Sequence, residues 1–184
     1  MEQLFQSLSD AIVMGMGVET LISEERYLHA SYEPDCEYED GALIERNIGE
    51  KDHSWLQLAL GAFFFRRRKL WNIEAFTEQR FRIDQGRYRI PDICVFRSPS
   101  PDEQVFTQPP LIWIEILSPE DRPIRINQKI RELLDFGVPN IWVIEPATLE
   151  SEIHTPAGSR NIEDQILRVE GTPIAVPLAG LEEE

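Results

Sequence analysis

The sequence predicts an α/β protein, in which a mixed (α+β) sheet carries flanking helices. Two segments, residues 89–96 (RIPDICVF) and 110–117 (PLIWIEIL), are apolar runs of strand length, as expected for strands buried on both faces. A helical pattern over residues 124–136 separates the second run from a third, at residues 141–145. Because the order is strand, helix, strand, the last two runs should be parallel neighbours with a right-handed crossover.

Size and composition predict one domain. The chain has 184 residues, 42% of them hydrophobic, which is sufficient for a sizeable core. We expect an N-terminal extension at residues 1–19, the domain at 20–181 and an acidic tail at 182–184. The sequence contains no apolar stretch of ~18 residues and no basic signal-peptide start, so no membrane association is expected. Cys36 and Cys94 lack metal-site or disulfide spacing, which favours a reducing cytoplasm.

The segments before the first apolar run predict two helices, a hairpin and a strand. Ser23 precedes a short helix over residues 24–30, with acids in its first turn. Residues 36–46 have the pattern of a hairpin that turns at Asp40-Gly41. Residues 52–69 form the longest helical pattern, with a broad apolar face and a basic end. Residues 72–83 alternate as one strand with a solvated face, and Gln85-Gly86 turns it into the first apolar run.

The later segments alternate loops with regular elements. Polar, proline-containing loops are expected at residues 98–109 and 118–123. Gly137, followed by Pro139, ends the helix of residues 124–136. Residues 150–177 should add one or two edge strands or a small meander to the sheet.

The charge is uneven along the chain. The formal net charge is −15, which argues against non-specific coating of nucleic acid. Residues 1–53 hold 13 acids and 3 bases, residues 54–131 hold 9 acids and 13 bases, and residues 132–184 hold 11 acids and 2 bases. The basic middle could form a local face for a polyanion, although uneven surface charge is also ordinary.

Each of the first two apolar runs contains one acid, Asp92 and Glu115, and an unpaired buried carboxylate is very costly. If the two strands are neighbours, both carboxylates could meet at one end of the sheet. A divalent cation such as Mg²⁺ would keep both ionised and would activate a water for phosphodiester cleavage. The backbone carbonyl of Ile116 could add a further oxygen ligand. Lys129, in the next helix, would hold the attacking water or stabilise developing charge.

The alternative is that each acid pairs with an arginine. Four arginines lie nearby in the sequence, at positions 80, 82, 87 and 89. For either acid alone this pairing is the simpler interpretation. For Asp92, Glu115 and Lys129 together the hydrolytic site is favoured.

The order of these motifs resembles the Uma family of restriction-endonuclease-like proteins, within the PD-(D/E)XK nuclease superfamily. The resemblance spans about residues 20 to 180 and rests on the acidic hairpin Glu37–Gly41, His53, the Pro-Asp of Asp92, the Glu115 strand, Lys129 and the block at residues 137–146. It implies a restriction-endonuclease-like core, with an N-terminal hairpin and flanking helices. Leu117 stands where the superfamily lysine would be, which resembles the family's usual state with the lysine moved to Lys129. Three positions depart from the family pattern: Leu133 and Ile141 replace tyrosines, and Glu145 replaces an aspartate.

The resemblance implies a Mg²⁺-dependent DNA endonuclease, with Mn²⁺ as a substitute. The implied catalytic residues are Asp92, Glu115 and Lys129, with Asp92, Glu115, the Ile116 carbonyl and Glu37 as metal ligands. Glu37 could equally be a solvated hairpin acid. His53 could contact the site or a phosphate, although such a histidine more often begins a helix.

Three functions remain open at this point. The first is a DNA endonuclease, for which one site per chain favours a homodimer when both strands are cut. The second is a catalytically inactive nuclease-fold protein whose acidic surface binds a basic partner. The third is a structural fold in which arginines make bidentate contacts with Asp92 and Glu115.

Overall fold

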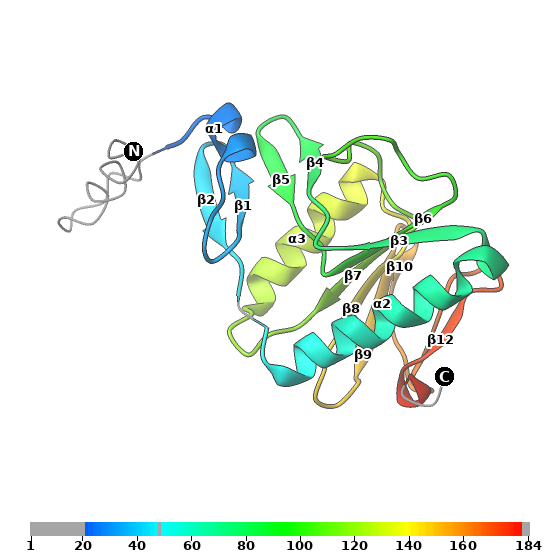
Figure 1. The fold of residues 1–184 in the computed structure, drawn as a ribbon. Coiled ribbons are helices and arrows are strands. Elements are labelled where there is room, and N and C mark those ends of the chain that lie inside the picture. Colours follow the sequence, from blue (N-terminus) through cyan, green and yellow to red (C-terminus); the bar gives the residue numbers. More distant parts are fainter. Residues whose placement is uncertain (1–20, 48, 182–184) are drawn as a thin grey trace.

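The computed structural model describes residues 21–47 and 49–181, arranged as two main sheets with helices around them (Figure 1). The expected extension at residues 1–19 and the tail at 182–184 lie outside the described residues. The observed mixed α+β architecture confirms the fold class expected from the sequence.

The larger sheet has six strands in the order β10-β9-β8-β7-β6-β3. Its strands are β3 (Ile73–Thr77), β6 (Ile93–Arg97), β7 (Ile112–Ile116), β8 (Ile141–Ile144), β9 (Ser151–Thr155) and β10 (Gly158–Asn161). The pair β7–β8 is parallel, as the strand–helix–strand order predicts, and each of the other pairs in this sheet is antiparallel. β6 and β7 are neighbours, so the two acid-bearing segments lie side by side.

The smaller sheet has four strands in the order β2-β1-β5-β4. Its strands are β1 (Cys36–Glu39), β2 (Ala42–Glu45), β4 (Phe81–Asp84) and β5 (Arg87–Arg89). The hairpin β1–β2 turns at Asp40 and Gly41, and both residues have positive φ, which is why an Asp-Gly pair suits this turn. Helix α1 (Glu24–His29), capped by Ser23, packs Tyr27 against Tyr38 of β1 and Tyr88 of β5.

Helices α2 (Lys51–Trp71) and α3 (Pro123–Phe136) cover opposite faces of the larger sheet (Figure 1). Side chains alternate along β6 and β7, so Ile93 and Ile114 join the α2 core, while Cys94 and Trp113 join the α3 core. The same alternation directs the Glu115 side chain to the α3 side, where Lys129 lies. Both strands are therefore apolar on each face, as their sequences indicate.

The C-terminal region completes the core on the α2 side. β11 (Ile166–Arg168) and β12 (Ala175–Pro177) form a separate two-stranded sheet, and the short helix η1 (Leu178–Gly180) follows. Leu167, Val176 and Leu178 are buried in the α2 core. The expectation of edge strands holds for β10, whereas β11 and β12 do not pair with the larger sheet.

Two sequence-based boundaries were wrong, for one reason. Residues 72–83 form two strands in different sheets, β3 and β4, rather than one. Residues 89–96 are likewise divided between β5 and β6, because the chain passes from one sheet to the other at Ile90, Pro91 and Asp92. The pattern of apolar residues alone does not reveal that the chain changes sheets. Pro91 marks it, since proline has no N–H to donate to a ladder.

Candidate active site

The acids predicted from the sequence converge with Lys129 in one open cleft of about 480 Å³. The Lys129 Nζ lies 2.7 Å from Glu115 Oε1 and 2.8 Å from Glu37 Oε1. Asp92 lines the same cleft, where β6 begins. Glu37 comes from β1 of the smaller sheet, so the cleft lies where the two sheets and α3 meet.

Lys129 owes its position to the amphipathic α3. Pro123 begins this helix, and Gly137, at φ 102°, ends it in a left-handed conformation that only glycine adopts readily. Ile130 and Leu133 anchor α3 in the core, which holds the neighbouring Lys129 over the sheet. Burial lowers the pKa of Lys129, but Glu115 and Glu37 outweigh it and raise that pKa above its ordinary value. Lys129 is therefore a fixed positive charge between two carboxylates.

Asp92 is held as a carboxylate by three donors. Its Oδ2 accepts the Ile116 backbone N–H at 2.7 Å and lies 3.5 Å from His53 Nε2, and its Oδ1 accepts Arg46 Nη2 at 3.0 Å. Burial raises the pKa of Asp92, but His53, Arg46 and the Ile116 N–H together bring it below its ordinary value. Asp92 is thus a buried acid that stays ionised.

Glu115 is the acid least compensated by its surroundings. Its Oε1 accepts the Trp113 Nε1–H at 2.5 Å as well as contacting Lys129. Burial is the main cause that raises the pKa of Glu115 to about 7, and the charges of Asp92 and Glu37 add to it against the opposing effect of Lys129. The site is therefore short of positive charge at Glu115.

Glu37 lies in the cleft rather than in solvent. It is 7% exposed, and its Oε1 accepts the Ile90 backbone N–H at 3.0 Å. Burial raises the pKa of Glu37, but Lys129 and Arg89 outweigh it and leave that pKa below its ordinary value. The sequence left Glu37 as either an acid of the site or a solvated acid of the hairpin, and its location is that of a site acid. Its role as a metal ligand stays a prediction.

Arg89 joins the cleft to the smaller sheet. Its guanidinium lies 2.7 Å from Glu39 Oε2, 2.7 Å from Glu132 Oε2 and 3.7 Å from Glu37 Oε2, and its side chain is only 4% exposed. The sequence suggested Arg89 as a partner for Asp92 or Glu115, whereas it pairs with three other acids. Together with Lys129 it fixes the Glu37 side chain from both sides.

Replacing Arg89 with methionine should therefore destabilise the fold strongly. Three acids would lose a buried partner, and breaking such a network costs about 3–5 kcal/mol. Urea unfolding measures the loss, with Arg97→Met on exposed Arg97 as the control. A loss no larger than that of the control would contradict the structural role of this network.

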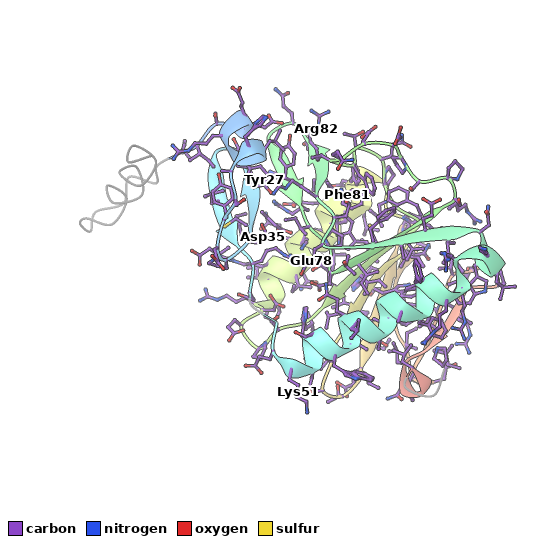
Figure 2. The ribbon with its side chains drawn as sticks, in the orientation of Figure 1. Tyr27, Asp35, Lys51, Glu78, Phe81 and Arg82 are labelled. Atoms are coloured by element: carbon purple, nitrogen blue, oxygen red, sulfur yellow. The ribbon has the colours of Figure 1, made fainter. Side chains whose placement is uncertain are left out.

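Arg46 is the site residue that sequence reasoning missed. It follows β2 and reaches Asp92 while also lying 3.8 Å from Asp35 and 4.0 Å from Glu78. Figure 2 shows Asp35 and Glu78 close together on segments far apart in sequence. Arg46 and Asp92 are 46 residues apart, and no motif marks the arginine, so only the folded hairpin brings it to the acid.

Arginine pairing explains only part of the site. Among the residues that the structure describes, Asp92 accepts one hydrogen bond from Arg46, and none of the four arginines named from the sequence is its partner. Among the described residues, the charged partner of Glu115 is Lys129, not an arginine. The two bidentate arginine contacts that a purely structural role requires are not formed.

His53 lies near the start of α2, as expected from the sequence, and also reaches the site. It is 9% exposed, and its hydrogen bond to Asp92 is the main cause that raises the pKa of His53. Its Nδ1 is buried without a hydrogen-bond partner among the described residues. His53 therefore positions Asp92 and carries positive charge more readily than a free histidine.

The donor set suits a hard divalent cation bound by few protein ligands. In the part of the chain that the structure describes, no group of three or more His, Cys, Asp or Glu side chains is arranged to hold a metal ion. Mg²⁺ usually takes one or two carboxylates, with water and substrate oxygens completing its shell. Asp92 and Glu115 fit that number. Burial and the nearby Asp92 and Glu37 raise the pKa of Glu115, and a cation beside its carboxylate would act against that rise.

Two comparisons with known proteins identify the family and the fold. Residues 24–182 match the Uma2 family, which is described as "Putative restriction endonuclease". The fold is similar to the crystal structure of a "putative nuclease belonging to DUF820" from Anabaena variabilis ATCC 29413, with a TM-score of 0.74 and 23% sequence identity. That similarity covers 88% of this chain and 98% of the other. No curated protein matches the chain.

The resemblance found in the sequence is therefore confirmed at the level of family and fold. The family match includes every acid of the cleft, Lys129, Arg46 and His53. No described helix has the length and apolar character needed to cross a bilayer. The chain belongs to the Uma2 family of restriction-endonuclease-like proteins.

Proposed function

We propose that the protein is a divalent-metal-dependent endonuclease that hydrolyses phosphodiester bonds in DNA. Mg²⁺ is the proposed ion, with Mn²⁺ as its substitute. The observation that carries the proposal is that Glu115 and Glu37 contact Lys129 in one open cleft, which Asp92 also lines. The family match supports a nuclease and does not favour the inactive, partner-binding alternative. The two free, buried cysteines are consistent with the proposed cytoplasmic location.

Asp92 and Glu115 are the proposed metal ligands, together with the Ile116 carbonyl. Within a strand, the N–H and C=O of one residue point to the same side. Because the Ile116 N–H is directed at Asp92, its carbonyl is directed to the same side of β7 as Asp92. Glu37 is held more firmly by Lys129 and Arg89, so it is proposed as a ligand through an intervening water.

The bound ion would lower the pKa of a water and stabilise charge on the phosphate oxygens. The protein's own groups have separate tasks. Lys129 Nζ would donate a hydrogen bond to the attacking water and stabilise the charge that develops on the phosphate oxygens. The Glu115 carboxyl, with a pKa near 7, would exchange a proton with solvent as the ion enters. Arg46 and His53 would hold Asp92 in its ionised form.

Cleavage of supercoiled plasmid DNA tests the proposal. We expect nicking or linearisation with Mg²⁺ that disappears with EDTA and falls by about 10²–10³-fold in Asp92→Asn and Lys129→Met. Asp102→Asn, in the exposed loop after β6, is the matched control and should retain full activity. Cleavage that persists equally in both site variants would reject the assignment.

A further inference from the structure

Helix α2 carries an apolar stripe on its outer face, opposite the face that packs on the sheet. Trp55, Leu58 and Phe65 are 42%, 73% and 61% exposed, and Ala62 lies between them. The spacing of these four residues is three, four, three, which keeps them on one side of a helix. The inner face buries a different set, including Leu56, Leu60, Phe63 and Phe64.

A helix that is apolar on two faces is normally buried on both. By contrast, α3 is clearly amphipathic, with its buried residues confined to one side. Figure 1 shows α2 running along the outside of the molecule, and Figure 2 marks Lys51 at its first turn. Within the described chain, the Arg68 guanidinium stacks over the Phe65 ring at 3.9 Å, and the stripe is otherwise open to solvent.

The charges on either side of the stripe favour a second copy of α2 as its binding partner. Acidic residues, Glu50 and Asp52, lie at the start of α2, and the basic residues 66–69 lie at its end. On a helix of about 3.6 residues per turn, Asp52 and Arg66 fall on one side of the stripe, and Glu50 and Arg68 on the other. An antiparallel second copy of α2 would thus set acid against base along both sides.

We propose that α2 packs antiparallel against α2 of a second copy of this chain, forming a two-fold symmetric dimer. The two-fold axis would cross α2 at the level of Leu60, on the outer side of the helix. It sets Trp55 against Phe65 of the partner subunit and Leu58 against Ala62 of the partner subunit. It sets Asp52 near Arg66 of the partner subunit. The same register sets Lys51 opposite Lys69 of the partner subunit at each end of the stripe, where the long, exposed side chains can turn away from each other into solvent.

This dimer would complete the proposed DNA-binding cleft, and in that respect the inference rests on the proposed function. The cleft of one chain is lined by eight acids and five Lys or Arg residues, an unfavourable balance for a polyanion. Asp52 is adjacent to His53, which contacts Asp92, so the start of α2 borders the cleft. The antiparallel arrangement brings the basic end of the partner helix, about 20–25 Å from its own cleft, to this border.

The mass of the full chain in solution, measured by light scattering after size exclusion, tests the dimer without metal or DNA. We expect a dimer for the wild type and a monomer for Leu58→Glu. Ile124→Glu is the matched control, because Ile124 is 77% exposed on α3, and it should remain dimeric. A monomeric wild type, or a Leu58→Glu chain that remains dimeric, would overturn the inference.

A charge exchange tests the register without altering the apolar stripe. Both Asp52 and Arg66 are exposed, so substitutions there should leave the fold intact. Arg66→Glu should weaken dimerisation, and the double variant Asp52→Arg/Arg66→Glu should restore it. Failure of the double variant to recover would reject the antiparallel register. A dimer without nuclease activity would contradict only the proposed function, and an active monomer would contradict only this inference.

Discussion

Replacing Lys129 with methionine is expected to destabilise the protein by about 3 kcal/mol near neutral pH, in addition to the loss of cleavage. Its Nζ contacts Glu37 and Glu115 at 2.8 and 2.7 Å, and removing one partner of a buried ion pair leaves uncompensated charge. Methionine matches the length of the lysine stem, so little packing is lost. Urea unfolding of the wild type and the variant measures the difference.

The cost of Lys129→Met should depend on pH. Glu115 already has a pKa raised to about 7, and loss of Lys129 would raise that pKa further. At about pH 6 Glu115 is protonated in both proteins, so it carries no charge for Lys129 to compensate. The destabilisation by Lys129→Met should therefore be smaller at about pH 6 than at about pH 8. Adding Glu115→Gln should recover part of the stability. Arg131→Met, on the exposed side of α3, is the control, and an equal loss there would contradict this account.

Divalent metal binding is expected to strengthen as the pH rises. The ion requires Glu115 ionised, so binding must release the proton that the folded apo protein holds there. Below pH 7 the affinity should rise by up to about tenfold per pH unit from this group, and the dependence should flatten above its pKa. His53 acts in the same direction, because its protonated form pairs with Asp92 in competition with the ion.

Calorimetry with Mn²⁺ in two buffers of different ionisation enthalpy counts the released protons. Glu115→Gln should bind the ion more weakly and lose most of the pH dependence.

In the apo wild type, the stability contributed by protonated Glu115 should be lost as the pH rises through about 7, because its folded pKa lies above the unfolded value. Saturating Mn²⁺ should remove this loss. Metal affinity that is independent of pH would contradict the assignment of Glu115.

The sequence was informative about the candidate site because an acid is conspicuous within an otherwise apolar strand. Asp92 and Glu115 were identified in that way, and Lys129 by its place in the helix that follows. The strands carrying the acids are neighbours in the sheet. The strand–helix–strand segment likewise places β8 parallel to β7, as predicted. Local patterns determined these features, so they could be recognised without coordinates.

The remaining features depend on contacts between the two sheets. Arg46 reaches Asp92, and Arg89 reaches Glu132, only because the hairpin sheet packs beside α3. Charged residues such as these resemble ordinary surface charges in the sequence. The division of residues 72–83 and 89–96 between sheets was missed for the same reason, since each half has a normal strand pattern. The packing of the two sheets separates the halves, and Pro91 is the residue that marks the second division in the sequence.

A crystal structure of the protein soaked in Mn²⁺ tests the central claim most directly. The account predicts an anomalous peak between the carboxylates of Asp92 and Glu115, near the Ile116 carbonyl, and no such peak in Asp92→Asn crystals. A soaked wild-type crystal with no ion between these acids, or with Arg46 still bound to Asp92 and the ion elsewhere, would contradict it.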